Sequence, residues 1–223
     1  LSATRYGWRI RNGHIFCKQG YLIMGVTSTS IQLIEKVLAL QPVKTVLELG
    51  AQNLYDKAYT LPIPYASTFY ESKGIEYKCV DLNGENNALK IDLEKSQTIK
   101  ETFDLVTDFG TGEHVRNAYN LLKIIHDSVK LNGIVIRQNP KTGNWAGHGF
   151  WYTTQELYQK LAYLNGYEII DIGEDAAMGN VTDGWNVWCI YRKVIDQPFI
   201  SRVIFESNIS IGNGIYYCST CKL

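Results

Sequence analysis

Short apolar runs alternate with amphipathic helical patterns through most of this chain, and this alternation limits the fold more than any other feature. The predicted strands are residues 43–50, 76–81, 103–109, 134–137, 167–172 and 187–191, and the second of them ends in an acid. Strands that alternate with helices form a mostly parallel sheet with helices on both faces. No helical pattern separates the last two runs, so an antiparallel edge strand is expected there. The prediction is a doubly wound α/β domain with a Rossmann-like sheet.

Several short motifs predict where helices and turns lie. Thr29 with Gln32, and Thr153 with Glu156, have the spacing of capping boxes at helix starts. Asn132-Gly133 predicts the end of the amphipathic helix that lies between them. Near the N-terminus, the Asn-Gly of residues 11–14 predicts a hairpin turn, because Asn-Gly readily takes positive φ.

The predicted domain core spans residues 43–193, and 223 residues suit one domain. Residues 1–42 form an N-terminal extension with the first helix. Residues 194–223 have no place in the alternating pattern. They could add an edge, cover a site as a lid, or serve as the arm of a homodimer.

Charge and hydropathy argue against two classes of partner. The chain has 22 basic and 22 acidic residues, whereas duplex nucleic-acid binding usually requires a basic excess. No nucleic-acid partner is therefore expected. Arg5, Arg9 and Arg11 interrupt any apolar run near the start, and no segment has the length and apolarity of a membrane span. A cytoplasmic location and no membrane partner are expected.

The five cysteines give no clear disulfide or metal pattern. Cys79 and Cys189 fall inside predicted strands, which is typical of buried thiols. Cys218 and Cys221 form a single C-x-x-C, and a structural zinc site needs about four ligands. No metal site is predicted.

Polar residues follow the first three predicted strands at places that suit a nucleoside ligand. In an open parallel sheet, ligands bind outside the carboxyl ends of the strands. Gly50 ends the first run after Glu48, and a glycine there allows a tight turn and close approach of a ligand. Asp81 ends the second run, where an acid can accept hydrogen bonds from ribose hydroxyls. Asp92 lies on the following loop and could receive an exocyclic amine.

These segments resemble the class I S-adenosylmethionine (SAM)-dependent methyltransferases. The resemblance covers roughly residues 43–192, and its main carriers are residues 46–51, 79–82, 91–93, 103–108 and 113–115. It implies that Glu48 and Gly50 hold the methionine end of SAM, that Asp81 holds the ribose and that Asp92 contacts the adenine. The expected cofactor contacts also include Ala51, Leu82, Leu93 and Asp108.

The chain departs from the pattern of this family in the first loop. The family usually has E-x-G-x-G-x-G, but Gln52 and Leu54 stand where the second and third glycines would be. The connection of residues 51–75 is also enlarged. A degenerate domain that no longer catalyses is therefore an open alternative.

Two histidines and a group of aromatic residues are candidates for the acceptor side. His114 and His148 lie on loops at the expected site, and imidazole titrates near neutral pH, so either could act as a base. Each could instead be a surface or structural histidine. Trp145, Phe150 and Trp151 could form a wall for a flat or sugar-like acceptor, or pack onto their own loop.

The sequence thus favours a SAM-dependent methyltransferase that acts on a small molecule, such as a sugar or another metabolite. The main alternative is a SAM-binding or non-catalytic partner domain. A third is an NAD(P)-dependent oxidoreductase, which needs a G-x-G-x-x-G that residues 50–55 do not supply. Modification of nucleic acid is disfavoured by the neutral charge.

Overall fold

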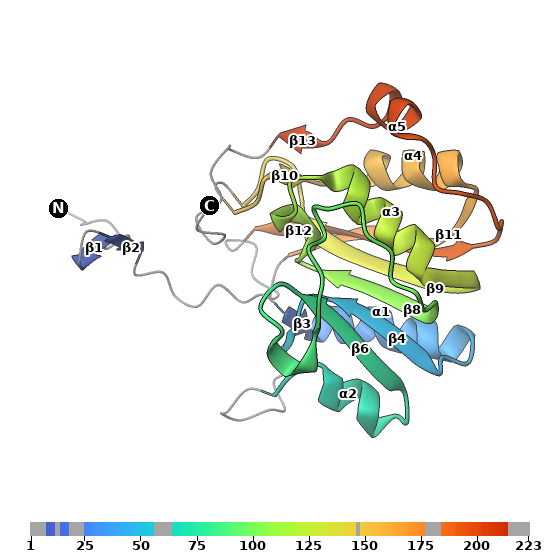
Figure 1. The fold of residues 1–223 in the computed structure, drawn as a ribbon, viewed down its shortest axis with the longest axis horizontal. Helices are drawn as coiled ribbons and strands as arrows, with labels where there is room; N and C mark the ends of the chain where they lie inside the picture. The colour runs from blue at the N-terminus through green and yellow to red at the C-terminus, as the bar shows by residue number, and fades with distance from the viewer. Residues whose placement is uncertain are drawn as a thin grey trace.

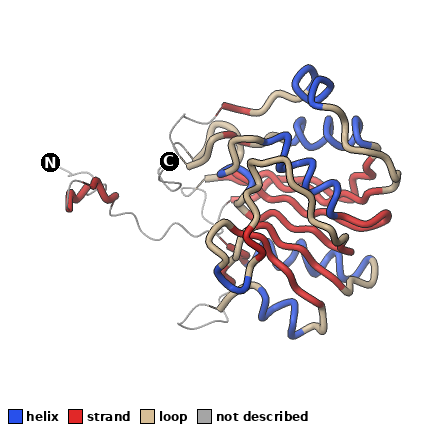
Figure 2. Tube along the Cα trace, in the orientation of Figure 1, coloured by secondary structure: helices blue, strands red, loops and turns tan. Residues whose placement is uncertain are grey.

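A seven-stranded sheet with helices on both faces forms the centre of the molecule (Figure 1, Figure 2). The computed structural model describes residues 8–11, 14–17, 25–55, 64–145, 148–176 and 184–213. The sheet consists of β4 (Thr45–Leu49), β6 (Glu76–Asp81), β7 (Leu89–Lys90), β8 (Phe103–Phe109), β9 (Val129–Pro140), β11 (Tyr167–Ala176) and β12 (Trp185–Lys193). The helices are α1 (Ser28–Leu40), α2 (Ser67–Ser72), α3 (Ala118–Ser128), α4 (Gln155–Asn165) and α5 (Arg202–Asn208).

The strand order is β11-β12-β9-β8-β4-β6-β7, which confirms the predicted fold class. The pairs from β9 through β8, β4 and β6 to β7 are parallel, and β12 is antiparallel to both β9 and β11. From β4 the chain continues to β6 on one side and later returns to β8 on the other. The carboxyl ends of β4 and β8 therefore flank the point where the winding direction reverses, which is where ligands bind in such sheets.

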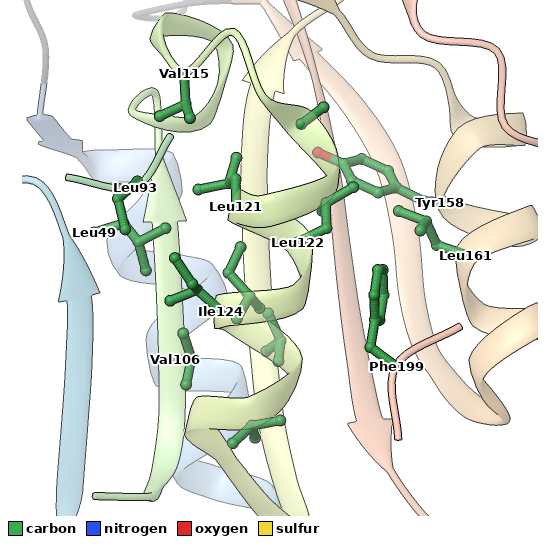
Figure 3. Packing of buried hydrophobic residues seen from close by; sticks show 14 of the residues in the cluster. Leu49, Leu93, Val106, Val115, Leu121, Leu122, Ile124, Tyr158, Leu161 and Phe199 are labelled. Carbon is green, nitrogen blue, oxygen red and sulfur yellow. The ribbon is translucent and has the colours of Figure 1, made fainter. Parts of the chain in front are cut away.

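Each face of the sheet has its own hydrophobic cluster. On one face, α1 and α2 bury Leu33, Ile34, Val37, Phe69 and Tyr70 against the strands. On the other face, side chains of α3 pack near Leu49 and Val106, and those of α4 lie in the same cluster beside Leu122 and Phe199 (Figure 3). Phe199 and Phe205 of the C-terminal extension belong to this second cluster, so the described part of that extension packs on the core. No helix within the described residues is long and apolar enough to cross a membrane.

Both predicted capping boxes were placed wrongly. The N-cap of α1 is Thr27, which exchanges hydrogen bonds with Ser30. Thr29 already has helical backbone and cannot serve as the cap. For α4 the N-cap is Thr154, whose side chain accepts from the Leu157 amide, while the Thr153 hydroxyl donates to backbone carbonyls of β9.

The predicted end of α3 at Asn132-Gly133 was also wrong. The helix ends at Ser128, and Val129 already pairs with Phe103 of β8. Asn132 has a φ of 64° within β9, which locates the irregular part of that strand.

Small strands accompany the main sheet. β1 (Trp8–Arg11) and β2 (His14–Cys17) form the predicted hairpin, with Arg11 opposite His14, although Asn12-Gly13 lies outside the described residues. β3 (Gly25–Thr27) pairs in parallel with β5 (Asn53–Tyr55), which the sequence patterns did not predict. β10 (Trp151–Tyr152) pairs with β13 (Gly212–Asn213), and η1 (Glu85–Asn87) and η2 (Gly112–His114) are short 3-10 turns.

A buried ion pair joins β8 to β9. Asp108 and Arg137 lie opposite each other in the parallel ladder, and neither side chain is exposed. Asp108 accepts from Arg137 Nε at 2.9 Å and Nη2 at 2.7 Å, and its other oxygen accepts from the amides of Thr111 and Gly112. The rings of Trp151 and Tyr158 flank the guanidinium at 5.6 and 5.5 Å. This pair therefore holds the loop after β8 in place.

Replacement of Arg137 by Met is expected to destabilise the fold strongly. The change leaves the Asp108 carboxylate buried without its cation, and breaking such a pair costs about 3 to 5 kcal/mol. The matched control is Arg192→Met, which breaks a more exposed pair with Glu168 and is expected to cost about 1 kcal/mol or less. Urea unfolding at neutral pH measures both; similar losses for the two variants would contradict this account.

Candidate functional site

The loop after β4 meets the end of β6, as the sequence predicts. Gly50 has a φ of 81°, and its amide donates to the Val80 carbonyl at 2.8 Å. The next amide, from Ala51, donates to Asp81 Oδ2 at 3.0 Å. The other Asp81 oxygen accepts from the Asn83 amide at 3.1 Å. The structure thus brings Gly50, Ala51 and Asp81 together at the carboxyl ends of β4 and β6.

Asp92 lies at the same edge of the sheet but is engaged with its own loop. The Ile91 amide donates to the Asp81 carbonyl at 3.3 Å, which places this segment beside the end of β6. The Asp92 carboxylate binds Lys95 at 3.0 Å and accepts from the Glu94 amide. The hydrogen bond from Lys95, together with the Glu94 amide, lowers the pKa of Asp92.

The two leucines predicted as cofactor contacts have opposite environments. Leu82, directly after Asp81, is 69% exposed, and its side chain forms an apolar surface at the end of β6. Leu93 is buried in the same cluster as Leu49 and belongs to the core (Figure 3). Only Leu82 is therefore placed where a ligand at this edge could touch it.

Glu48 lies inside the sheet, with no exposed surface. Its carboxyl accepts from the Tyr77 hydroxyl at 2.6 Å and from Thr107 at 3.5 Å. Burial raises its pKa to about 8, although these hydrogen bonds oppose the rise. Glu48 is therefore mainly protonated at neutral pH and ties neighbouring strands together.

Side-chain hydrogen bonds link the loops that follow β4 and β8. Gln52 Nε2 donates to the Leu49 carbonyl at 3.0 Å and to Thr111 Oγ1 at 2.7 Å. Thr111 in turn donates to the same carbonyl at 2.7 Å. A Cβ on Gly50 would lie 2.5 Å from both Gln52 and Thr111, so this packing requires a glycine. These hydrogen bonds connect the loops after β4 and β8.

The two predicted histidines come together around a third residue, Glu113. His148 Nε2 lies 3.3 Å and His114 Nε2 lies 3.7 Å from Glu113 Oε1. The imidazole rings are 4.8 Å apart and nearly perpendicular. Glu113 is buried, and burial alone would raise its pKa. The hydrogen bond from His148 and the charges of both histidines outweigh burial and lower the pKa of Glu113.

Buried polar groups fix the position of Glu113. Its second oxygen accepts from Asn139 Nδ2 at 3.1 Å, and the same Nδ2 lies 3.2 Å from Asp108 Oδ2. Asn139 Oδ1 accepts from the Tyr158 hydroxyl at 2.8 Å. A Cβ on Gly149 would come within 2.9 Å of Glu113, so a glycine is needed beside His148. The histidine cluster therefore rests on the same network as the Asp108–Arg137 pair.

The three predicted aromatic residues do not form one wall. Trp151 is buried, with its indole N–H donating to the Val115 carbonyl at 2.8 Å, so it belongs to the core. Trp145 and Phe150 are partly exposed, and the Trp145 ring lies 5.2 Å from the ring of His148. The guanidinium of Arg116 lies 4.5 Å over the Phe150 ring. Trp145 and Phe150 therefore remain candidates for contact with an acceptor.

Three polar residues of this site were not among the predicted site residues. Glu113 was seen in the sequence only as a neighbour of His114, and Gln52 only as a departure from a glycine pattern. Thr111 carried no signal. The position of Glu113 directly before His114, on a loop after a strand, was the one signal that could have identified it.

Comparison with known proteins finds similarity in structure alone. No family model matches the chain, and no curated protein sequence matches it. It is similar to the Burkholderia thailandensis 1,6-didemethyltoxoflavin-N1-methyltransferase, solved with S-adenosylhomocysteine (SAH), with a TM-score of 0.52, 15% identity and 73% and 76% of the two chains covered. Similarity to the N-methyltransferase NodS of Bradyrhizobium japonicum WM9 with SAH gives a TM-score of 0.51 at 12% identity, covering 73% and 84%. For StiE O-MT the TM-score is 0.52 at 12% identity, covering 80% and 78%.

The chain has the fold of the class I SAM-dependent methyltransferases. At these identities the likeness establishes the methyltransferase fold and not the reaction. The [4+2]-cyclase SpnF illustrates the difference, because it is also similar to this chain, with a TM-score of 0.50 at 12% identity over 74% and 81% of the chains. The reaction of this chain therefore depends on the residues at the site and not on the fold.

The buried carboxyl of Glu48 predicts that stability falls as pH rises. Between its ordinary pKa of 4.5 and about 8, the folded chain keeps a proton that the unfolded chain releases. The free energy of unfolding then falls by up to about 1.4 kcal/mol per pH unit in this range. Its contribution is full below pH 4.5 and is lost as pH rises through about 8. Glu48→Gln, which is neutral at every pH, should remove this slope.

Urea unfolding of both proteins from pH 5 to 8 checks this prediction. The variant should gain stability relative to the native chain as pH rises, because the other titrating groups are shared. The control Glu35→Gln changes a glutamate that is 55% exposed and should leave the slope unchanged. A stability difference for Glu48→Gln that does not vary with pH would refute a buried, protonated Glu48.

Proposed function

We propose that this chain binds SAM at the edge formed by β4, β6 and β7 and transfers the methyl group to a small molecule. The observation that carries the proposal is the contact between Asp81 and the Ala51 amide, beside the reversal point of a parallel sheet. An acid held there can accept from the ribose hydroxyls of a nucleoside. Two proteins of similar fold were crystallised with SAH, which supports the same ligand class here.

The residues at this edge fit the adenosyl part of SAM better than the methionine part. Asp81 offers carboxylate oxygens, and exposed Leu82 offers an apolar surface beside it. At the methionine side, Gln52 and Thr111 replace the open backbone of a glycine-rich loop with polar side chains. In this chain, these side chains would have to supply the hydrogen bonds to SAM that backbone amides supply in a glycine-rich loop.

In the proposed reaction, bound SAM supplies a methyl group on a positively charged sulfur. A lone pair of the acceptor forms a bond to the methyl carbon, and the carbon–sulfur bond breaks with its electrons moving to sulfur, which gives SAH. The chain has to align the acceptor with this bond and exclude water. If the acceptor atom carries a proton, that proton must leave, and the histidine cluster is placed on the adjacent loop to receive it.

The proposed acceptor is a small molecule with a flat or sugar-like part. Trp145 and Phe150 offer partly exposed aromatic faces near His148. The zero net charge provides no general attraction for nucleic acid. The similar Burkholderia protein was crystallised with the small molecule 1,6-didemethyltoxoflavin, which shows that this fold accommodates such an acceptor in that protein.

A second candidate function is SAM binding without methyl transfer. The observation in its favour is the first loop, where Gln52 and Leu54 stand in place of glycines and Leu54 is buried in β5. Among the described residues, β5 follows Gly50 and the next helix begins at Ser67, so no helix N-terminus follows the loop directly. A SAM complex that methylates no acceptor from sugar, amine or hydroxylated aromatic classes would favour this function.

Isothermal calorimetry with SAM and SAH tests the proposed binding site. The native chain is expected to bind SAH with micromolar affinity. Asp81→Asn should weaken binding about 10- to 100-fold, because hydrogen bonds to a charged group contribute about 1.5 to 3 kcal/mol. Asp127→Asn is the matched control: this aspartate pairs with Lys123 on α3 and should leave the affinity unchanged.

Two outcomes would contradict the proposal. One is the absence of SAM and SAH binding by a folded native chain at high micromolar ligand. The other is equal SAH affinity of the Asp81 and Asp127 variants, which would move the ligand away from β6. Tighter binding of NAD than of SAH would favour an oxidoreductase instead.

A further inference from the structure

We propose that Glu113, His114 and His148 form a binding site for one divalent transition-metal ion, with Zn²⁺ as its representative. One oxygen of Glu113 faces Nε2 of both histidines, at 3.3 and 3.7 Å. The potential ligand atoms of the three residues all lie within 4.8 Å of one another. This is the one such cluster of histidine, cysteine or acidic side chains among the residues that the structure describes.

The distances suit a tetrahedral ion with little movement. Zinc binds imidazole nitrogen and carboxylate oxygen at about 2.0 to 2.2 Å, so two ligand atoms of a tetrahedron lie about 3.3 to 3.6 Å apart. The two measured nitrogen–oxygen distances are 3.3 and 3.7 Å. The His114–Glu113 distance needs to shorten slightly on binding, and the separation of the two imidazoles, at most 4.8 Å, needs to shorten further.

The charge at the site also favours a cation. The Glu113 carboxyl group has 1% of its side chain exposed, and a buried carboxylate needs positive charge beside it. A divalent ion supplies that charge and binds the histidines in their neutral form. Two imidazoles and one carboxylate form a ligand set that proteins use for zinc and for non-haem iron.

Further polar groups hold the ligands as metal sites require. Asn139 donates to Oε2 of Glu113, which leaves Oε1 directed at the histidines. Asn139 is itself held by the Tyr158 hydroxyl and lies against the Asp108 carboxylate. Such outer contacts orient metal ligands and tune their affinity. The close contact of Gly149 with Glu113 keeps His148 beside this carboxylate.

Three protein ligands leave at least one coordination position for another oxygen. The histidine side chains are 10% and 11% exposed, so the site lies just beneath the surface. We infer that a hydroxyl or carboxylate oxygen of the methyl acceptor occupies this position. This second step rests on the proposed function, whereas metal binding itself does not. It takes the place of the histidines as the base, because a metal-bound imidazole nitrogen cannot accept a proton.

Metal titration of the full chain, stripped with a chelator, tests the site. Co²⁺ is followed by its visible absorption and Zn²⁺ by competition with a chromophoric chelator. One equivalent of each ion should bind, and Zn²⁺ should have a Kd below about 1 μM and raise the melting temperature. Glu113→Gln, His114→Gln and His148→Gln should each weaken Zn²⁺ binding by about 100-fold or more, because each removes a direct ligand.

The double variant Cys218→Ser/Cys221→Ser is the control for the C-terminal C-x-x-C. Retained binding in this variant, with loss in the three ligand variants, supports the proposal. Loss in the cysteine variant alone, with a thiolate-to-cobalt absorption band, would assign the metal to the thiols and overturn it. Millimolar Zn²⁺ affinity of the native chain would also overturn it and leave a metal-free Glu113–His148 pair.

Circular dichroism checks that each variant is folded. If a variant does not fold, the Zn²⁺ affinity and stoichiometry of the native chain decide between the outcomes. SAH calorimetry on the same samples separates the two proposals. Metal binding without SAH binding would contradict the proposed function alone, and SAH binding without metal binding would contradict the metal site alone.

Discussion

The buried pair of Asp108 and Arg137 is the interaction on which the rest of the site depends. It joins β8 to β9 where the two strands reach the carboxyl edge of the sheet. Because Asp108 also accepts from the amides of Thr111 and Gly112, the ion pair fixes the loop that carries Glu113 and His114. A Cβ on Gly112 would lie 2.6 Å from the Asp108 carboxylate, so the loop can pack this closely only with a glycine there. An ion pair on the surface would contribute little to stability. This pair is buried, so a substitution that removes one partner leaves an uncompensated charge and is strongly destabilising.

Two groups of residues meet across the reversal point of the sheet. On one side, Ala51 and Asp81 mark the edge proposed to hold the adenosyl part of SAM. On the other side, the histidine cluster stands on the loop after β8. The hydrogen bond between Gln52 and Thr111 connects the two loops, so neither can move far without the other. In the proposed function, the methyl donor lies on one side of this junction and the acceptor on the other.

Patterns local to the chain predicted the strands of the main sheet well. The predicted runs 76–81 and 103–109 match β6 and β8 residue for residue. The predicted N-cap residues differ from the observed ones by one or two positions, because two threonines stand near the start of each helix. The burial of Glu48 and Trp151 could not be predicted, because it depends on which face of the sheet meets which helix. The grouping of Glu113 with His148 depends on a contact between residues far apart in the chain, and periodicity carries no information about such contacts.

A crystal structure of the full chain with SAH would test the central claim most directly. The account predicts that a ribose hydroxyl lies within hydrogen-bonding distance of the Asp81 carboxylate, that the adenine contacts Leu82, and that the sulfur faces the loop of His114. SAH bound at another face, or an Asp81 side chain that turns away from the ligand, would contradict the account.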